Sequence, residues 1–469
     1  MPRLFKKLFK HCHGGDEDDD SSGDEIEDHS AGDLSYVGTA AYEVLRTKHN
    51  DHHKELWNVT KGKVVGDIQM TPRDAFTRTE TIDPPPGNDD WFPEKIGQMI
   101  ARTTKWCDIM TLAPPDGKFL IEIKKGLAAI CTHPDLLGGR VVVRFLMANI
   151  IGMPVNCNAL IRELTKDLPS NAPDKIKLWV GGWRKGVSWN HAKIIAVDGL
   201  HLWTGGHNFW DKHYLQESPV NDLSLEMEGG VAKDAHRYAN AQWGYIMKKQ
   251  STAWGRFVDK RLPDAFEVPR KARVTVSDYP ASTTAEFPPY WKEEKQALGR
   301  RPMEVDPLYV PVVTMGRYGV ILKKARPSDD AFVAMIDSAK HVIRMSLQDL
   351  GPVCIPKTKL ALPGLSWPKA YLDALARVIW LKCVDVEIVL SNPNSIPGNC
   401  SPTEANYGNG WDCVDVAAEI IKSIQRQYPD AHEGDLRRKV EDNLRICFLK
   451  SPRGGSSYKS GATLGLHCK

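Results

Sequence analysis

Hydrophobic and polar positions alternate with two different periods along the chain from about residue 90 onward. Stretches with apolar side chains at helical spacing are followed by short runs rich in β-branched and aromatic residues. The expected helices cover residues 93–106, 118–130 and 157–168, and the expected strands cover residues 107–112, 141–146 and 176–180. Strands that are separated by helices are typical of an α/β fold whose sheet is largely covered.

The same order of elements recurs after residue 325. The expected helices there cover residues 330–340, 368–381 and 414–427, and the expected strands cover residues 342–347, 384–390 and 444–448. Residue identity between the two halves is faint, so the prediction of a duplication depends on the order of the elements. We therefore predict two duplicated α/β sandwich units, over residues 36–256 and 326–469, joined by a Pro-rich connector at residues 257–325.

The first 35 residues have a different character. Residues 3–10 place Leu and Phe on one side of a helix and Arg and Lys on the other, which is typical of a short helix on a membrane surface. A disordered tail with an accidental pattern is the alternative, because ten residues hold no helix in water unaided. An acidic tract at residues 16–33 follows and cannot build a core. We expect a disordered tail whose basic start contacts membranes peripherally.

Composition narrows the class of protein. The chain has 469 residues, 42% of them hydrophobic, yet it shows no membrane-spanning apolar run and no signal peptide. Ten dispersed cysteines without paired spacing indicate reduced thiols, so we expect a cytoplasmic protein with peripheral membrane contact that is not secreted. Ten acidic and four basic residues precede residue 36, which leaves the remainder with nine more basic than acidic side chains. This excess suits an anionic substrate without singling out nucleic acid.

Two short patterns carry the candidate chemistry. One is centred on His191 and Lys193, and the other on His467 and Lys469 at the end of the chain. On a strand, side chains two positions apart point to the same face of the sheet. We therefore expect each pattern to place a nucleophile or proton carrier beside a fixed cation, as phosphoryl chemistry requires.

The first pattern continues with four residues to Asp198, six more to two glycines, and then x-Asn208. This spacing resembles the signature of the phospholipase D superfamily, which occurs twice in each active site. The second copy stops after Lys469, whereas the resemblance implies an Asp five residues later, followed by the glycines and Asn. We interpret the second unit as incomplete and the chain as cut short within its motif.

The resemblance implies an active site at the interface of the two units. One of His191 and His467 would attack phosphorus and form a phosphohistidine, while the other would protonate the leaving alkoxide. Lys193 and Lys469 would hold the nonbridging oxygens, and Asn208 would donate to the same oxygens. The sequence does not decide which histidine is the nucleophile.

Two acidic residues complete the implied site. Asp198 would be more structural than catalytic, tying down the loop behind the motif strand. Asp222 would hold the second ring nitrogen of the nucleophilic histidine. The implied mechanism uses no cofactor, and a metal site built from His201, His207 and His213 is disfavoured because no carboxylate stands at ligand spacing.

Aromatic side chains and loops near the motifs leave two interpretations open. The tryptophans around the first motif either line an acyl or headgroup pocket or pack in the core: Trp183, Trp189, Trp203 and Trp210. The longer loops of the second half, residues 352–367 and 392–409, are expected to wall the active site.

We expect a phospholipase D-type phosphodiesterase that hydrolyses phospholipids such as phosphatidylcholine to phosphatidic acid, with transfer to an alcohol left open. A phosphodiesterase acting on nucleic acid is one alternative, although no stripe of basic and aromatic residues for strand binding is visible. A catalytically inactive lipid-binding protein is the other, and the incomplete second motif favours it. The expected partner is a phospholipid or another phosphodiester, and we expect a monomer with an internal pseudo-twofold.

Overall fold

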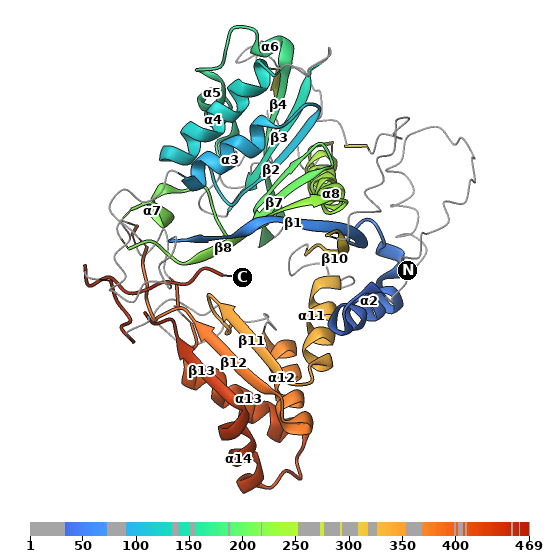
Figure 1. The fold of residues 1–469 in the computed structure, drawn as a ribbon, viewed down its shortest axis with the longest axis vertical. Coiled ribbons are helices and arrows are strands. Elements are labelled where there is room, and N and C mark those ends of the chain that lie inside the picture. Colours follow the sequence, from blue (N-terminus) through green and yellow to red (C-terminus); the bar gives the residue numbers. More distant parts are fainter. Residues whose placement is uncertain are drawn as a thin grey trace.

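Two β-sheets organise the chain in the computed structural model (Figure 1). The strands of the larger sheet are β1 (Trp57–Thr71), β2 (Trp106–Met110), β3 (Val141–Ala148), β4 (Ile176–Lys185), β5 (Ser188–Trp189), β6 (Ile194–Val197), β7 (His201–Gly205), β8 (Asp222–Gly229), β9 (Arg273–Thr275) and β10 (Val310–Met315). Their order is β10-β1-β8-β7-β6-β2-β3-β4-β5, with β9 paired to β4. The α/β class predicted from the alternating periods is confirmed. The structure describes residues 33–72, 91–133, 140–150, 155–185, 188–216, 218–251, 273–275, 291–292, 308–317, 326–352, 368–397, 400–401, 407–408, 410–451, 454–458 and 460–468.

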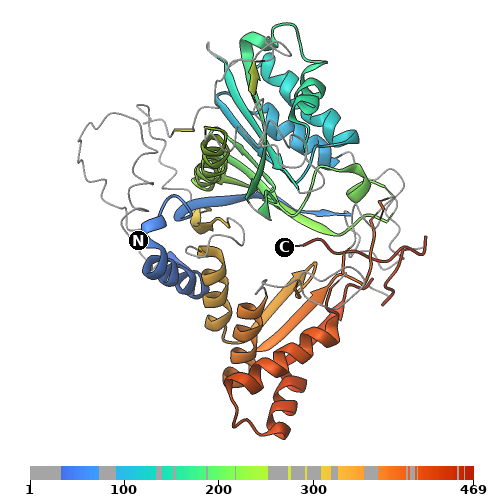
Figure 2. The same cartoon turned by 180° about the vertical axis from the view of Figure 1, so that it is seen from behind.

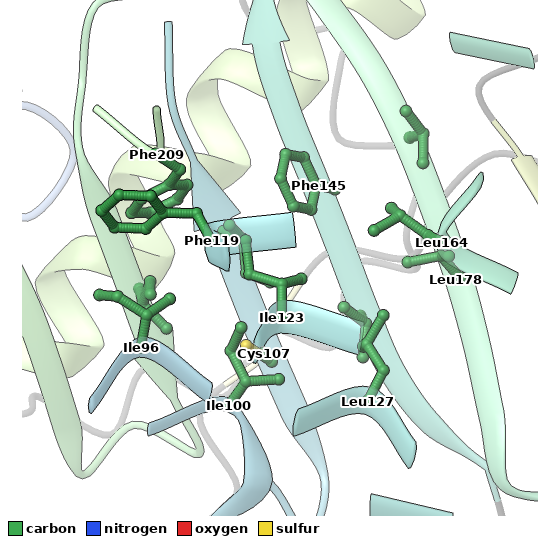
Figure 3. Packing of buried hydrophobic residues seen from close by; sticks show 14 of the residues in the cluster. Ile96, Ile100, Cys107, Phe119, Ile123, Leu127, Phe145, Leu164, Leu178 and Phe209 are labelled. Atoms are coloured by element: carbon green, nitrogen blue, oxygen red, sulfur yellow. The ribbon is translucent and has the colours of Figure 1, made fainter. Parts of the chain in front are cut away.

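Helices cover both faces of the larger sheet. One face packs on α3 (Trp91–Ala101), α4 (Gly117–Cys131), α5 (Cys157–Thr165) and α6 (Ala172–Lys175), and the other packs on α8 (Val231–Ser251). Because side chains alternate along a strand, β2 sends Ile109 to the first face and Met110 to the second. Figure 3 shows the core on the first face, where Phe119, Ile123 and Leu127 of α4 lie against the strands.

The smaller sheet contains three parallel strands, β11 (Val342–Leu347), β12 (Asp385–Leu390) and β13 (Leu444–Phe448). It packs on α11 (Pro327–Ser338), α12 (Lys369–Lys382), α13 (Cys413–Gln427) and α14 (Glu433–Asn443). The sequence predicted β11 and β13 to the residue and α13 to within one residue. It gave no expectation for α14, α8 or β1.

Segments from outside the predicted units join these sheets. Strands β9 and β10 come from the predicted connector and pair with β4 and β1 of the larger sheet. Helix α2 (Tyr36–His49) packs on α11, where His49 Nε2 lies 2.7 Å from Asp330 Oδ2. The domain boundaries and the internal duplication stay predictions. The predicted membrane helix at residues 3–10 lies outside the described residues.

The C-terminal segment runs between the two sheets. In both views its end lies between β1 and β8 of the larger sheet and β11 of the smaller one (Figures 1 and 2). The backbone N–H of His467 donates to Asn221 O at 2.8 Å, and the N–H of Gln348, directly after β11, donates to Cys468 O at 3.0 Å. The segment that carries the second motif is thereby held by both halves of the protein.

Candidate active site

The first motif lies in an extended segment between β5 and β6. The prediction that its His and Lys share a strand is wrong, because β6 begins one residue after Lys193. The side chain of Asn190 holds this segment in place. Its amide Nδ2 donates to Thr111 O, just beyond β2, at 2.9 Å and to Leu146 O, within β3, at 3.3 Å. Hydrogen bonds from a buried side chain, and not backbone hydrogen bonds between strands, therefore hold the motif. His191 is exposed, whereas Lys193 is buried and donates from Nζ to His191 O at 2.8 Å.

The second motif histidine faces the first. The imidazole rings of His191 and His467 have centroids 6.4 Å apart and an interplanar angle of 79°. His467 is 2% exposed, and its neighbour Leu466 forms a parallel bridge with Asn221, the residue directly before the first-half strand β8. The structure therefore brings together the two histidines that the sequence selected from opposite halves.

Asp222, at the start of β8, contacts the histidine of the other half. Its Oδ2 lies 2.5 Å from His467 Nδ1, and both side chains are buried. Asp222 Oδ1 also accepts the backbone N–H of Leu223 at 2.9 Å. This pairing fixes the orientation of the His467 ring and leaves Nε2 as its second nitrogen. Sequence spacing identified Asp222 as the acid, but it did not indicate that its partner would be His467, from the other half of the chain.

Two tyrosines that the sequence analysis missed surround this pair. The hydroxyl of Tyr214 donates to Asp222 Oδ2 at 3.0 Å and accepts the backbone N–H of Asn208 at 3.0 Å. The ring of Tyr407 lies 4.9 Å from that of His467 between centroids. Tyr214 ends the short helix α7 (Asp211–Tyr214), six residues after Asn208 in the same motif loop. Its place in the motif loop, close to Asn208, is the signal that could have identified it.

The two motif glycines give the strand β8 room to approach. A Cβ at Gly206 would lie 1.9 Å from Asp222 Oδ1, and a Cβ at Gly205 would lie 2.2 Å from Ser224 Oγ. A side chain at position 205 would displace the backbone of β8, and one at position 206 would displace the Asp222 carboxylate. The glycines therefore allow Asp222 to reach His467.

Asn208 follows the glycine pair and is fully buried. Neither Nδ2 nor Oδ1 of its amide has a hydrogen-bond partner within the described part of the chain. A buried polar group without a partner costs about 1–3 kcal/mol, so the amide needs an explanation beyond the fold. Lys469, the remaining cation of the predicted site, lies outside the described residues.

Asp198 lies in the turn between β6 and β7, away from the facing histidines. Its carboxylate accepts backbone N–H groups from Thr104 at 2.8 Å, Lys105 at 2.9 Å and Trp106 at 2.6 Å, as well as the Thr104 hydroxyl. Its backbone φ of 52° belongs to the left-handed region that Asp tolerates better than most residues. These contacts tie the motif hairpin to the start of β2.

The other motif histidines make separate contacts. His207 lies between Thr71 Oγ1 at 2.7 Å and Ser224 Oγ at 2.8 Å, and burial lowers its pKa to about 4. His213 Nδ1 lies 3.0 Å from the hydroxyl of Tyr407. Across the described ranges, no group of three or more His, Cys, Asp or Glu side chains is arranged to hold a metal ion.

A cavity of about 620 Å³ opens beside the first motif, with His191 and Lys193 in its wall. Trp183 and Trp189 also line it, as one of the two interpretations expected. Trp203 is instead buried in the core. Trp183 belongs to a core cluster as well as to the cavity wall, and Trp210 donates from Nε1 to Pro114 O at 2.9 Å, so both interpretations apply in part.

Comparison with curated proteins found a similar enzyme. The curated phospholipase D of Streptomyces antibioticus is 26% identical over 423 residues, which cover 80% of this chain and 67% of that protein. The chain is therefore similar to the phospholipase D superfamily. No protein-family profile matches. Phosphatidylserine synthase of Haemophilus influenzae Rd KW20 superposes with a TM-score of 0.42 at 10% identity, covering 91% of this chain and 79% of that one. The family member Nuc of Salmonella typhimurium gives 0.25 at 12% identity, covering 38% and 93%.

Members of the phospholipase D superfamily are phosphodiesterases, and the geometry found here agrees with that chemistry. Two imidazoles face one another at the meeting point of the halves, with a carboxylate behind one of them and a buried lysine beside the other. Among the helices of the described residues, none is long and apolar enough to cross a bilayer.

Proposed function

We propose that this protein is a phospholipase D-type phosphodiesterase that hydrolyses a phospholipid to phosphatidic acid through a phosphohistidine intermediate. The facing pair of His191 and His467, with ring centroids 6.4 Å apart, carries the proposal. This separation leaves room between the rings for one tetrahedral phosphate, since reacting atoms stand about 3 Å apart before reaction.

The proposed reaction has two balanced steps. One imidazole nitrogen forms a bond to phosphorus while the bond from phosphorus to the headgroup oxygen breaks, and the other imidazole gives its proton to that oxygen. In the second step, the now neutral imidazole takes a proton from water as the water oxygen attacks phosphorus. The bond between phosphorus and the first imidazole breaks, which regenerates both side chains. An alcohol in place of water would give transfer.

Neighbouring residues support these steps. The contact between Asp222 and His467 Nδ1 orients the ring so that Nε2 can exchange the proton. Lys193 supplies positive charge beside His191, where the nonbridging oxygens gain negative charge. We propose the same role for Lys469, and we propose that the unpaired amide of Asn208 serves those oxygens.

The cavity beside His191 supports a lipid as the substrate. Its wall combines His191 and Lys193 with apolar side chains such as Trp183, Trp189 and Leu202. Other polar and charged side chains also line it, including Lys54, Glu55, Asp234 and Arg317. Concave sites of this size that combine apolar surface with polar groups are typical of binding sites for small organic molecules. A single-stranded nucleic acid would instead require a basic groove with aromatic side chains on which successive bases stack.

Product analysis tests this proposal. The chain is incubated with phosphatidylcholine and ethanol in the presence of EDTA, and the lipids are identified by mass spectrometry. We expect phosphatidic acid and phosphatidylethanol from the wild type and from the control His341→Ala, whose side chain is exposed and lies outside the site. We expect neither product from His191→Ala or His467→Ala.

Two results would overturn the proposal. Absence of both lipid products from the wild type, together with cleavage of single-stranded DNA, would identify the nucleic-acid alternative. Undiminished product formation by both histidine variants would remove the facing pair from the mechanism.

A further inference from the structure

Two aspartates beside the first motif cap one another's helices. Asp116 stands at the N-cap position of α4, yet its side chain makes no capping hydrogen bond there. Its Oδ1 instead accepts the backbone N–H of Asp211, the first residue of α7, at 2.7 Å. The carboxylate of Asp211 in turn accepts the N–H of Lys118, in the first turn of α4, at 2.9 Å to each oxygen. The first turn of each helix is therefore capped by the acid that belongs to the other.

Gly117 makes room for the acid from the other helix. Its φ is 48°, in the left-handed region that glycine adopts without strain. A Cβ at this position would lie 2.0 Å from Asp211 Oδ2, closer than real Cβ contacts come. The start of α4 is therefore shaped to receive a carboxylate from the loop that follows Asn208.

Further hydrogen bonds join the same two segments. The backbone N–H of Asp116 donates to Phe209 O at 3.1 Å, and Trp210 Nε1 donates to Pro114 O at 2.9 Å. The three residues that directly follow Asn208 are thus held to the start of α4 through backbone and side-chain groups.

Helix α4 is a rigid support for this loop. Its side chains Phe119, Ile123 and Leu127 are fully buried in the core on the first face of the larger sheet (Figure 3). Because protein interiors are close-packed, the helix cannot shift without disturbing that core. The position of Asn208 is therefore tied to the sheet through α4. A hydrogen-bond donor stabilises a transition state most when it is held in place before the reaction.

The exchange of caps has an electrostatic cost. Burial raises the pKa of the Asp116 carboxyl, and the nearby charge of Asp211 also acts to raise it. The partial positive charge at a helix N-terminus offsets part of this repulsion. Asp412 shows a local arrangement, because it caps its own helix α13 by accepting two of that helix's N–H groups at 2.9 and 3.0 Å. What the exchange adds to a local cap is a connection between α4 and the loop that carries Asn208.

We propose that Asp211 and Asp116 are positioning residues for the reaction, which hold the Asn208 amide where the nonbridging oxygens gain negative charge. This inference rests on the proposed function. Loss of either cap releases the loop after Asn208 from α4, so the amide no longer meets the transition state in the correct place. The kcat therefore falls while KM changes little, because the lost interaction is made in the transition state.

The test is the steady-state kinetics of a soluble diester, bis(p-nitrophenyl) phosphate, measured beside urea unfolding. Asp211→Ala and Asp116→Ala should each lower kcat roughly tenfold to a hundredfold, since a misplacement of about 1 Å has an effect of that order. Asp211→Asn should recover most of this loss, because Asn is also a good helix cap. The matched control is Asp412→Ala, which removes a partly buried capping acid from α13 and should lower the urea midpoint without changing kcat.

A double variant shows whether Asp211 acts through the amide. In the Asn208→Ala background, Asp211→Ala should leave kcat unchanged, because the group that it positions is already absent. Reductions that multiply in the double variant would overturn this inference. Wild-type kcat in both aspartate-to-alanine variants, with urea midpoints lowered as in Asp412→Ala, would also overturn it and make the two acids structural caps alone. No cleavage of this diester or of phosphatidylcholine by the wild type would overturn the proposed function itself, and this inference with it.

Discussion

Replacing Gly206 with Ala tests how the two halves build the site. The added Cβ would lie 1.9 Å from Asp222 Oδ1, whereas real Cβ contacts are almost never shorter than 3.0 Å. The carboxylate must therefore retreat by about 1 Å, and its 2.5 Å contact with His467 Nδ1 is lost or bent. A misplacement of about 1 Å in a catalytic group lowers turnover by roughly a hundredfold.

The stability of the Gly206→Ala variant separates geometry from unfolding. Overpacking of this kind costs about 1–3 kcal/mol, while domains are stable by about 5–15 kcal/mol. The variant should therefore remain folded, with the far-ultraviolet circular dichroism of the wild type. Gly410→Ala is the matched control, because its nearest neighbour would be 3.6 Å away.

The assay is turnover of a soluble phosphodiester, measured beside urea unfolding for the wild type and both variants. The ring nitrogen shifts of His467, measured by NMR, report directly on its contact with Asp222. Turnover of Gly206→Ala within threefold of the wild type would refute the reasoning, because the steric conflict would then have been absorbed without disturbing the acid–histidine pair.

Three further changes have defined outcomes. Asp198→Asn should lower the free energy of unfolding by about 1–3 kcal/mol, and Asp198→Ala should lower it by more. The reason is that Asn keeps a hydrogen-bond acceptor and tolerates the positive φ at this position. Urea unfolding in which the Asn variant is the less stable of the two would contradict this. His207 has a folded pKa of about 4 against an ordinary value of 6.5, so only the unfolded chain binds a proton between these values. Unfolding at pH 7 and pH 5 should show a loss of about 2 kcal/mol that His207→Gln removes; equal losses would exclude this histidine as the source. Tyr214→Phe should lower kcat about tenfold in steady-state assays, equivalent to one hydrogen bond of about 1.4 kcal/mol, and an unchanged kcat would remove Tyr214 from the positioning of Asp222.

The sequence predicted elements well where a short apolar strand is bounded by polar turns, as in β11 and β13. It missed α8, because three of the side chains that α8 packs on the sheet are alanines, which give the helix little hydrophobic contrast: Ala232, Ala235 and Ala239. It also missed β1, a strand of 15 residues whose central Gly66 has a φ of 69° and interrupts the alternation. Tertiary packing, which local periodicity does not report, determines both elements.

The candidate site divides in the same way. Fixed spacing identified His191, Lys193 and Asn208, and the second motif identified His467, because chemistry at a shared phosphate restricts residue type and offset together. The contact of Asp222 with His467 spans 245 residues, and no local pattern states which histidine an acid will meet. Tyr407 was out of reach for a related reason, since an isolated tyrosine in a loop carries no periodic signal.

The interval of 245 residues between Asp222 and His467 has a consequence for synthesis in the cell. At ribosomal speeds of about 5–20 residues per second, the first half exists for about 10 to 50 s before its partner histidine is made. During that time the nascent chain already contains His191, Lys193 and Asp222, yet it lacks His467, the histidine that Asp222 contacts. The candidate site is therefore incomplete while the first half is being made, and it is assembled only when both halves have folded against each other.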